Sequence, residues 1–164
     1  MFLSDKANIA YNMSIDGYVL NEKLSFEDKA MKPVVPILKD VDVHPYRWAR
    51  LTVPVGFVYK PNKMSMPPGF GWIVDYLSVE KSLIIYDYLT WKLRSYKMKL
   101  NLDNENETIK KTKKIVDTLF LDMLSKESGL SGWKLSVIKF LINNFSNSAL
   151  SLRNDDDARM ADAN

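Results

Sequence analysis

Apolar and polar residues alternate along two consecutive stretches in the middle of the chain. Apolar side chains occupy odd positions from Leu83 to Leu93 and even positions from Tyr96 to Leu102. A period of two is typical of a half-buried strand, and the Ile, Tyr, Trp and Thr content also favours a strand. We therefore predict strand here, with a bulge or break near Arg94–Ser95 where the phase changes. A buried helix over Trp72–Tyr88 is the alternative.

A helical pattern follows a short acidic turn. Apolar residues recur every three or four positions, which predicts a helix from about Asn106 to Lys126, with Gly129 as a stop. Asn104, with Glu107 three residues later, resembles a capping box, and Glu105 and Glu107 suit the positive end of the helix dipole. The predicted apolar face comprises Ile109, Val116, Leu119, Phe120, Met123 and Leu124, with Ile115 at its margin.

Weaker patterns precede this region. Ile9–Leu20 alternates and is predicted to form either a hairpin that turns at Asp16-Gly17 or one longer strand. A short helix is predicted over Phe26–Lys32, with a second turn reaching Lys39. Tyr46–Tyr59 has apolar residues at its odd positions and predicts a strand; because Pro54 has no amide hydrogen to donate, we place this strand at a sheet edge.

Two further segments leave their structure open. Pro61–Gly71 is predicted to be a long loop. For 129–144 we favour a strand that passes into a short helix, although Trp133, Val137, Leu141 and Phe145 would equally line one face of a helix. The elements together predict an α+β fold, with a small mixed or antiparallel sheet packed against one long and one or two short helices. We expect a single domain over 1–145 and a disordered acidic tail over 146–164.

Composition narrows the chemistry. The chain of 164 residues is long enough to bury a core, and it has no cysteine, which excludes disulfides, thiolate catalysis and cysteine zinc sites. Its formal net charge of +3 suits anionic partners without identifying them. We expect no secretory signal, since the N-terminal segment has neither a basic start nor a long apolar run, and no stretch approaches the length of a membrane span.

No residue set in the sequence is typical of a catalytic or metal site. His44 is the only histidine, and catalysis would need two acidic residues and a nucleophile beside it. Asp103, Glu105 and Glu107 lack the glycine of a calcium loop and are better explained as helix-capping residues. Gly69 and Gly71 flank Phe70 without a nucleotide-binding fingerprint. We therefore predict no enzyme, no cofactor and no bound metal.

Lysines are concentrated around the acidic turn. They either form a solvated helix face or a basic patch for the phosphates of RNA or lipid. Those within Lys110–Lys114 also have the pattern of a nuclear-import signal. The predicted basic patch comprises Lys97, Lys99, Lys110, Lys111, Lys113 and Lys114, with Lys92 and Arg94 beside it.

An apolar set in the predicted loop suggests a protein–protein contact. Methionine and phenylalanine suit a pocket on a neighbouring subunit, and a loop docking into a separate pocket would give head-to-tail self-association. The alternative is that these side chains fold back onto the core. The predicted self-association residues are Met64, Met66, Pro67, Pro68 and Phe70. If they are exposed, changing Met66 and Phe70 to Ser should abolish oligomers without altering the thermal midpoint.

The order of these segments resembles the matrix proteins of rhabdoviruses, most closely the compact plant type. The segments that carry the resemblance are Ser14–Val19 with a helix in 25–39, Met66–Pro68, Tyr96–Asp103 as a strand leading into the long helix, and Gly132–Leu135 as a closing strand. The chain departs from the animal members, because it has no lysine-rich N-terminal arm and Phe70 stands in the tyrosine position of their Pro-Pro-x-Tyr motif.

The resemblance implies a viral structural matrix protein that self-associates and bridges the nucleocapsid to the membrane during assembly. Its partners would be itself, the viral nucleoprotein–RNA complex, an anionic membrane surface bound peripherally, and RNA. It would be found in the virion and the host cytoplasm, and in the host nucleus if Lys110–Lys114 acts as an import signal. The alternative function is a small basic nucleic-acid-binding or regulatory protein without enzymatic activity.

Overall fold

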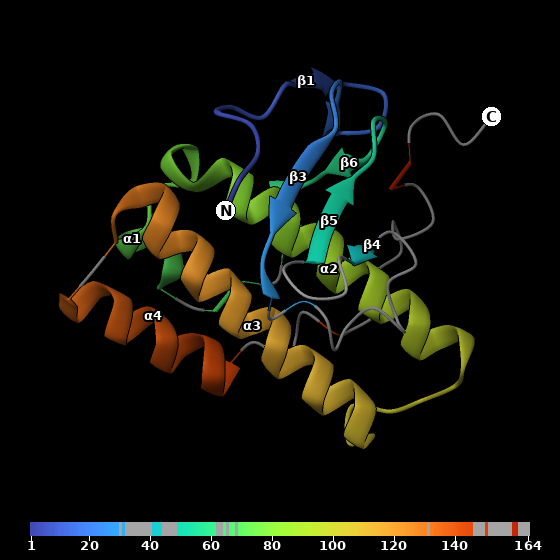
Figure 1. The fold of residues 1–164 in the computed structure, drawn as a ribbon, viewed down its shortest axis with the longest axis vertical. Coiled ribbons are helices and arrows are strands. Elements are labelled where there is room, and N and C mark those ends of the chain that lie inside the picture. The colour runs from blue at the N-terminus through green and yellow to red at the C-terminus, as the bar shows by residue number, and fades with distance from the viewer. Residues whose placement is uncertain are drawn as a thin grey trace.

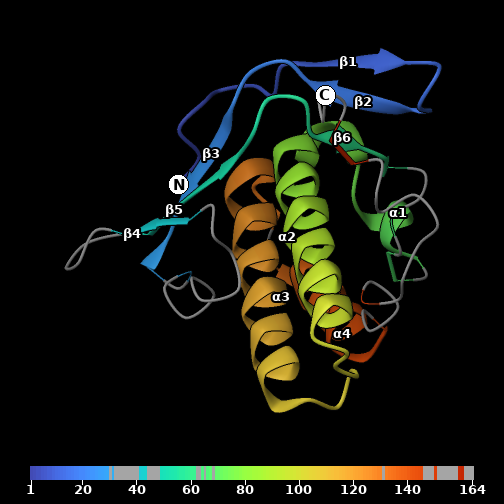
Figure 2. The same ribbon diagram turned by 90° about the vertical axis from the view of Figure 1, so that its right-hand side faces the viewer.

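Long helices and two small antiparallel sheets form the computed structural model of this chain, which describes residues 1–29, 31, 41–43, 49–61, 64, 66–67, 69–130, 132–145, 150 and 159–160. Helices α2 (Glu80–Lys99) and α3 (Glu107–Ser128) run side by side, and α4 (Gly132–Phe145) lies against α3 (Figures 1 and 2). The short α1 (Phe70–Ile73) contacts α4, and the 3-10 helix η3 (Tyr76–Val79) leads into α2. The predicted α+β fold is confirmed, with more helix than the sequence pattern indicated.

The strands form two three-stranded sheets within the described residues. One sheet has the order β1 (Ile9–Asn12), β2 (Gly17–Leu20), β6 (Val58–Tyr59). The other has the order β3 (Leu24–Glu27), β5 (Ala49–Val53), β4 (Val41–Val43). All pairs are antiparallel. Figure 2 shows both sheets gathered around one end of the α2–α3 pair, so the opposite end of the two helices is left for the turn that joins them.

The predicted hairpin over Ile9–Leu20 is confirmed, with a longer turn than expected. β1 and β2 pair with Asn12 opposite Gly17, and residues 13–16 make the turn, in which Asp16 has a positive φ of 46°. Gly17 thus belongs to the strand and not to the turn. A Cβ atom at this position would lie 2.7 Å from Val58 Cγ1, so the close approach of β2 to β6 requires glycine here.

Two predictions for the first half of the chain are wrong. Phe26, expected to start a short helix, lies in β3 and is fully buried, because its side chain faces the core from a strand paired with β5. Much of the predicted second turn toward Lys39 lies outside the described residues. The strand predicted at an edge is also different: β5 lies between β3 and β4. Pro54 causes no loss of a sheet hydrogen bond there because β5 ends at Val53.

The strand predicted over 83–102 is a helix for most of its length, and the alternative of a buried helix for part of this region is correct. In α2 every residue from Ser82 to Thr90 is buried. A helix enclosed on all sides is apolar all round, so it shows no 3.6-residue periodicity, and the chance alternation of its side chains indicated a strand. The strand propensity of its aromatic and β-branched residues is outweighed by the burial that tertiary packing supplies.

Helix α3 confirms the sequence prediction almost to its ends. Its predicted apolar face is buried, and Ile115 lies at the margin, partly exposed. Gly129 ends the helix in the left-handed conformation, with φ of 65°. The cap differs, because Asn106 and not Asn104 is the N-cap: its side-chain oxygen accepts from the amides of Thr108 at 3.0 Å and Ile109 at 3.3 Å.

The segment predicted as a strand passing into a short helix is helical from Gly132 onward, in α4. Ile138 and Ile142 are its fully buried residues, while Trp133 and Phe140 are 67% and 61% exposed. The strand prediction failed because only one narrow stripe of this helix faces the core, and the exposed Trp133 contributed to an apparent alternation with Leu135 and Val137.

The first turn of α2 is capped from the far end of α3. No side chain of its own N-cap residue accepts from the helix amides. The Glu127 carboxylate accepts from the Lys81 amide at 2.9 Å and from the Ser82 amide at 3.1 Å. It thereby satisfies two amides that a helix start leaves unpaired. Burial raises the pKa of Glu127, and its hydrogen bonds with Ser82 and Lys81 oppose that shift.

Part of the predicted disordered tail lies on the domain. Leu150 is buried in a small cluster with Leu93 and Ile109. Arg159 is fully buried and forms an ion pair with Asp87 of α2. The prediction of disorder is therefore wrong at these residues, because an arginine and a leucine in the polar tail find buried partners that no local pattern reveals. The remainder of 146–164, apart from Met160, lies outside the described residues.

Candidate interaction surfaces

The turn between α2 and α3 brings several of the predicted basic residues around one pocket. This lysine pocket has a volume of ≈ 370 Å³ and takes residues from the turn, from α3, from α4 and from the C-terminal segment. Three lysines and one carboxylate line it, so its charge favours an anion. The lining residues are Asn104, Lys110, Lys113, Lys114, Asp117, Asn143 and Leu150.

The lysines of this pocket are held to different degrees. Lys110 forms an ion pair of 2.5 Å with Glu105, in which both side chains are largely exposed, whereas Lys114 is exposed on the same helix. Lys97 of α2 closes the rim: its ammonium donates to Asn104 Oδ1 and to the Leu150 carbonyl, both at 2.7 Å. An exposed ion pair contributes little to stability, so Lys110 can exchange Glu105 for a bound anion at small cost.

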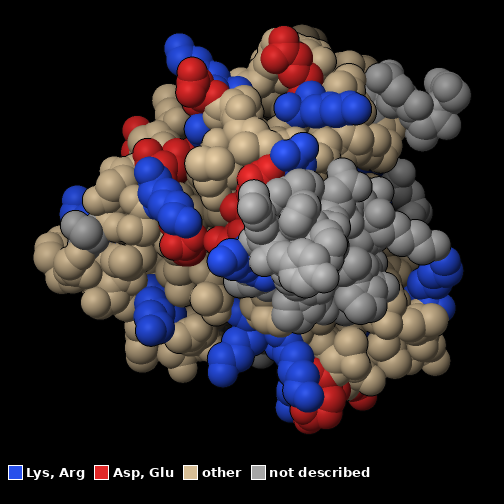
Figure 3. Space-filling model, in the orientation of Figure 1, with Lys and Arg blue, Asp and Glu red and all other residues tan. Residues whose placement is uncertain are grey.

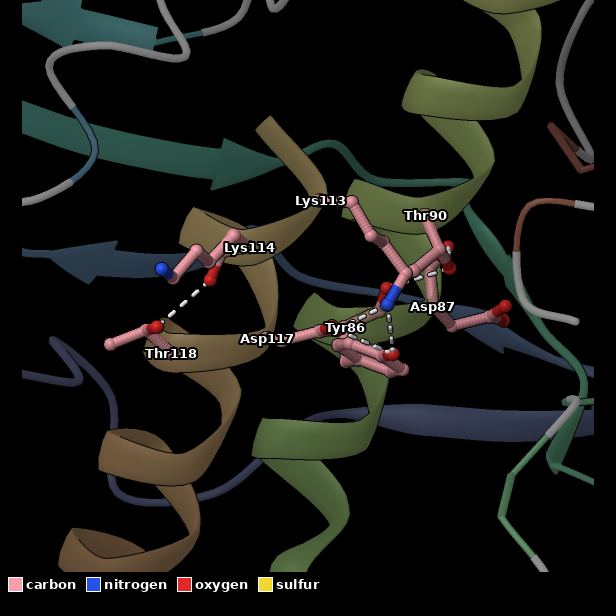
Figure 4. A network of polar contacts seen from close by, with 7 residues as sticks. All are labelled: Tyr86, Asp87, Thr90, Lys113, Lys114, Asp117 and Thr118. Carbon is pink, nitrogen blue, oxygen red and sulfur yellow. Dashed lines mark hydrogen bonds and ion pairs between the residues drawn. The ribbon is translucent and has the colours of Figure 1, made fainter. Parts of the chain in front are cut away.

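Lys113 lies deepest in the pocket and belongs to a buried polar network that joins α2 and α3 (Figure 4). Its ammonium forms an ion pair with Asp117, one turn later, and donates to the Tyr86 hydroxyl at 3.3 Å. Tyr86 in turn donates to Asp117 Oδ1 at 3.0 Å. Burial lowers the pKa of Lys113, and the Asp117 carboxylate opposes that shift. The network fixes the floor of the pocket.

The structure divides the predicted basic patch. Lys110, Lys113 and Lys114 line the lysine pocket and Lys97 donates to two of its lining residues, whereas Lys99 and Lys111 are exposed and do not line it. The neighbouring Arg94 is fully buried. In Figure 3 a group of Lys and Arg side chains gathers below the grey atoms, over the N-terminal half of α3, and acidic side chains are interspersed among the other basic ones. A compact pocket therefore replaces the extended patch.

The residues predicted for self-association have mixed exposure. Phe70 is only 1% exposed and stacks on Phe120, and Pro67 is buried, so Phe70 is wrong as a side chain available for insertion into a neighbour. Met64 and Met66 are partly buried against the core, and Pro68 lies outside the described residues. Met64 and Met66 line a pocket of ≈ 570 Å³. Trp72, another lining residue of this pocket, is 95% exposed. No pattern in the sequence singles out Trp72.

The predicted absence of catalytic and metal chemistry stays a prediction. His44 lies outside the described residues. Within the described part of the chain, no three His, Cys, Asp or Glu residues are placed to share a metal ion. Asp103 accepts from the Glu105 amide at 3.0 Å, as a turn-forming residue does. None of the described helices is both long enough and apolar enough to cross a bilayer.

Models of protein families, curated proteins and solved structures give no match to this chain. The candidate surfaces therefore rest on the geometry of the chain alone.

Residues from distant parts of the chain complete these surfaces, and no local sequence pattern indicates them. Asn143, at the end of α4, reaches the lysine pocket, and Leu150 forms another part of its wall. Asp87 and Arg159 are 72 positions apart and meet in the core. A helical wheel would have identified Lys113 as inward-facing, because it follows Ile109 by four positions and precedes Val116 by three.

Proposed function

We propose that this chain is a non-enzymatic structural protein of the matrix type, which binds phosphate-bearing surfaces through the lysine pocket and self-associates during viral assembly. Three lysines of α3 line one pocket, and Lys97 of α2 donates to two residues of its wall; this gathering is the observation that carries the proposal. Nucleocapsid RNA and anionic lipid both present phosphates, and a protein that bridges them needs a site for this group and no active site.

The chemistry of the pocket suits a phosphate. Lys110 and Lys114 are exposed on α3 and can approach its oxygens, and the side-chain amides of Asn104 and Asn143 can donate further hydrogen bonds. Asp117 does not repel the ligand strongly, because its carboxylate already accepts from Lys113 and Tyr86. The lining is thus arranged for an anion of about the size of a phosphate or a phospholipid headgroup.

The matrix assignment itself rests on the resemblance, and two of its segments have changed. Tyr96–Asp103 begins as the end of α2, and Gly132–Leu135 is helical, where the resemblance implied strands. The small nucleic-acid-binding or regulatory protein is the alternative function, since the same pocket would serve RNA alone. The two functions differ in whether membranes and self-association are involved.

Co-sedimentation tests the proposal with two charge-reversal variants that alter the net charge equally. Vesicles of phosphatidylcholine with and without phosphatidylserine are compared with the free RNA oligonucleotide. Lys110→Glu/Lys114→Glu should weaken vesicle binding by roughly 30-fold or more, at about 1 kcal/mol for each lysine near the surface. Lys23→Glu/Lys29→Glu, on exposed residues outside the pocket, is the matched control and should change binding far less.

Three outcomes would change the assignment. Equal loss in both variants would mean that net charge and not the pocket drives binding. Tight RNA binding with a steep salt dependence, without vesicle binding or self-association, would favour the alternative function. A chain that stays monomeric at high concentration and binds neither ligand would remove the matrix function.

A further inference from the structure

The C-terminal segment lies as a short added strand beside β6. One edge of β6 pairs with β2. On its other side the Val58 amide donates to the Arg159 carbonyl at 2.6 Å, and Phe57 and Met160 form an antiparallel bridge. Addition of a strand to a free sheet edge is a common way for one chain to bind a segment of another, because the backbone supplies the hydrogen bonds.

Side chains beside this edge contact the side chain of Arg159. The Arg159 guanidinium is fully buried and forms an ion pair with Asp87 of α2. Its central carbon lies 5.3 Å from the centre of the Phe57 ring. Asp87 also accepts from the Lys60 amide at 3.5 Å. We call this the tail groove, with a carboxylate at its base, the Phe57 ring as one wall and the β6 edge as its side.

The anchored residues are far from the end of α4. Phe145 ends α4 at the opposite end of the helices from β6, and the C-terminal segment reaches β6 beside the sheets (Figures 1 and 2). Leu150 is held near Leu93 and Ile109, and eight residues, 151–158, join it to Arg159. At full extension this link spans roughly 30 Å. A tail groove within that distance, on the same or another molecule, is within reach.

We propose that the tail groove also receives Arg159–Met160 of a second copy, so that copies exchange their C-terminal segments. The contacts in the groove involve only Arg159 and Met160, and an identical segment of another chain supplies the same atoms. The inference rests on the proposed function only in naming a route for self-association. If each copy gives its segment to one neighbour and receives another's, the arrangement is head-to-tail and either closes into a ring or propagates.

Concentration sets the choice between a molecule's own segment and a neighbour's. A segment joined to its binding site through a link of a few residues meets that site at an effective concentration of about a millimolar. In dilute solution the molecule's own segment therefore occupies its groove. Where copies are crowded on a surface, the neighbour's segment competes on equal terms, so exchange would begin at the site of assembly.

Two complementary variants of the full chain test this exchange. Arg159→Ala removes the anchor and keeps the groove, whereas Asp87→Asn impairs the groove and keeps the anchor. Each variant alone should be monomeric at micromolar concentration in analytical ultracentrifugation. Mixed, they should form a heterodimer, because the Asp87→Asn chain offers Arg159 to a groove whose own tail lacks the guanidinium and competes only through its backbone and Met160. The wild-type chain should dimerise only at a concentration about a hundredfold or more above that needed by the mixed variants, near the millimolar effective concentration of its own tail.

A matched control pair uses another ion pair of the same chain. Arg50 and Glu27 are 2.5 Å apart between β5 and β3, and neither belongs to a terminal segment. Mixing Arg50→Ala with Glu27→Gln should give no association. Both Arg159→Ala and Asp87→Asn should retain the vesicle binding of the wild type, so a failure of exchange is distinguished from a failure of the lysine pocket.

The inference is overturned if the two folded variants, checked by circular dichroism, associate no more strongly when mixed than when separate. Where a variant does not fold, half-labelled wild-type chain at millimolar concentration supplies a second measurement. An isotope-filtered nuclear Overhauser effect between the Met160 methyl of one chain and the Phe57 ring of another is then expected. Contacts confined to one chain at that concentration would equally contradict exchange.

Discussion

Lys113 shows how the burial of one charged residue depends on its neighbours in space. It lies one turn before Asp117, and its ammonium contacts that carboxylate and the Tyr86 hydroxyl in the core. A buried charge is tolerated when it is paired and hydrogen-bonded, whereas an unpaired one is strongly unfavourable. The pair therefore determines how α3 sits on α2 more than it adds to stability.

Removing one member of this network should be worse than removing all of it. Asp117→Ala leaves the Lys113 ammonium buried without its carboxylate, and we expect a loss of about 3–5 kcal/mol in the free energy of unfolding. The triple change Tyr86→Phe/Lys113→Met/Asp117→Leu should retain most or all of the stability. Urea denaturation measures both. Asp122→Ala, in a partly exposed pair of 2.7 Å with Lys126, is the control and should lose at most about 1 kcal/mol. A triple variant less stable than Asp117→Ala would contradict this account.

Phe70 gives a second prediction at this scale, which reverses the one made from sequence. Because Phe70 is buried against Phe120 and Tyr76, Phe70→Ser should lower the free energy of unfolding by roughly 3 kcal/mol or more and the thermal midpoint by roughly 10 °C. Trp72→Ser, on a side chain that is 95% exposed, should leave the midpoint nearly unchanged. Differential scanning calorimetry compares the two, and equal midpoints would show that Phe70 is not a core residue in solution.

At the scale of elements, the way in which a helix is buried determined whether its sequence pattern predicted it. α3 has one buried face and one solvent-exposed face, so its helical periodicity, its length and its glycine stop could all be predicted from the sequence. The β1–β2 hairpin was predicted from the alternation within Ile9–Leu20, although residues 10–12 of β1 are exposed. Residues 82–90 of α2 are all buried, so its apolar residues show no helical period. In α4 the helical spacing of Trp133, Val137 and Leu141 competes with an alternation through Leu135.

The cap that α3 supplies to α2 should make stability depend on pH through Glu127. Its folded pKa is raised by burial, so the folded state holds the proton more tightly than the unfolded chain does. This contribution is fully present below the unfolded pKa, near 4.5, and is lost as the pH rises through the folded value. Glu127→Gln cannot titrate, so the wild type should gain stability relative to this variant as the pH falls from 7 toward 4. Urea denaturation across that range measures the free energy of unfolding of both chains. A wild type that loses stability relative to Glu127→Gln as the pH falls would contradict the assignment.

For the whole molecule, the described residues divide into a deeply buried centre and a more exposed periphery. Residues 82–90 of α2 are all buried between α3, β6 and the rest of the core, whereas residues 10–12 of β1 are exposed. Local opening is easiest where few apolar contacts are lost. Hydrogen–deuterium exchange read by mass spectrometry should therefore find the strongest protection in 83–90 and 116–124 and the weakest, among paired strands, in β1. Equal protection of β1 and α2 would show that the molecule opens only as one unit.

The candidate site could be predicted only in part at this scale. The sequence singled out a group of lysines, because they crowd one turn and its flanks, and their role in binding stays a prediction. It could not show that three of them meet Asn143 and Leu150 around one pocket, since those residues arrive from α4 and the C-terminal segment. Asp87 and Arg159 gave no signal at all, because a single acid and a single base 72 positions apart carry no period or motif.

The cap at the start of α2 also introduces a delay during synthesis of the chain, between the making of α2 and the making of its capping residue. The Lys81 amide has its hydrogen-bond acceptor only after Glu127, 46 residues later, has been synthesised. Ribosomes add about 5–20 residues per second, so the first turn of α2 stays unsatisfied for roughly 2–9 seconds after its own residues are made. Throughout that interval α2, whose residues 82–90 are all buried in the folded protein, lacks both its cap and the helix that covers it. The nascent chain is then at its most prone to aggregate, and chaperones that recognise exposed apolar segments have their best opportunity to bind.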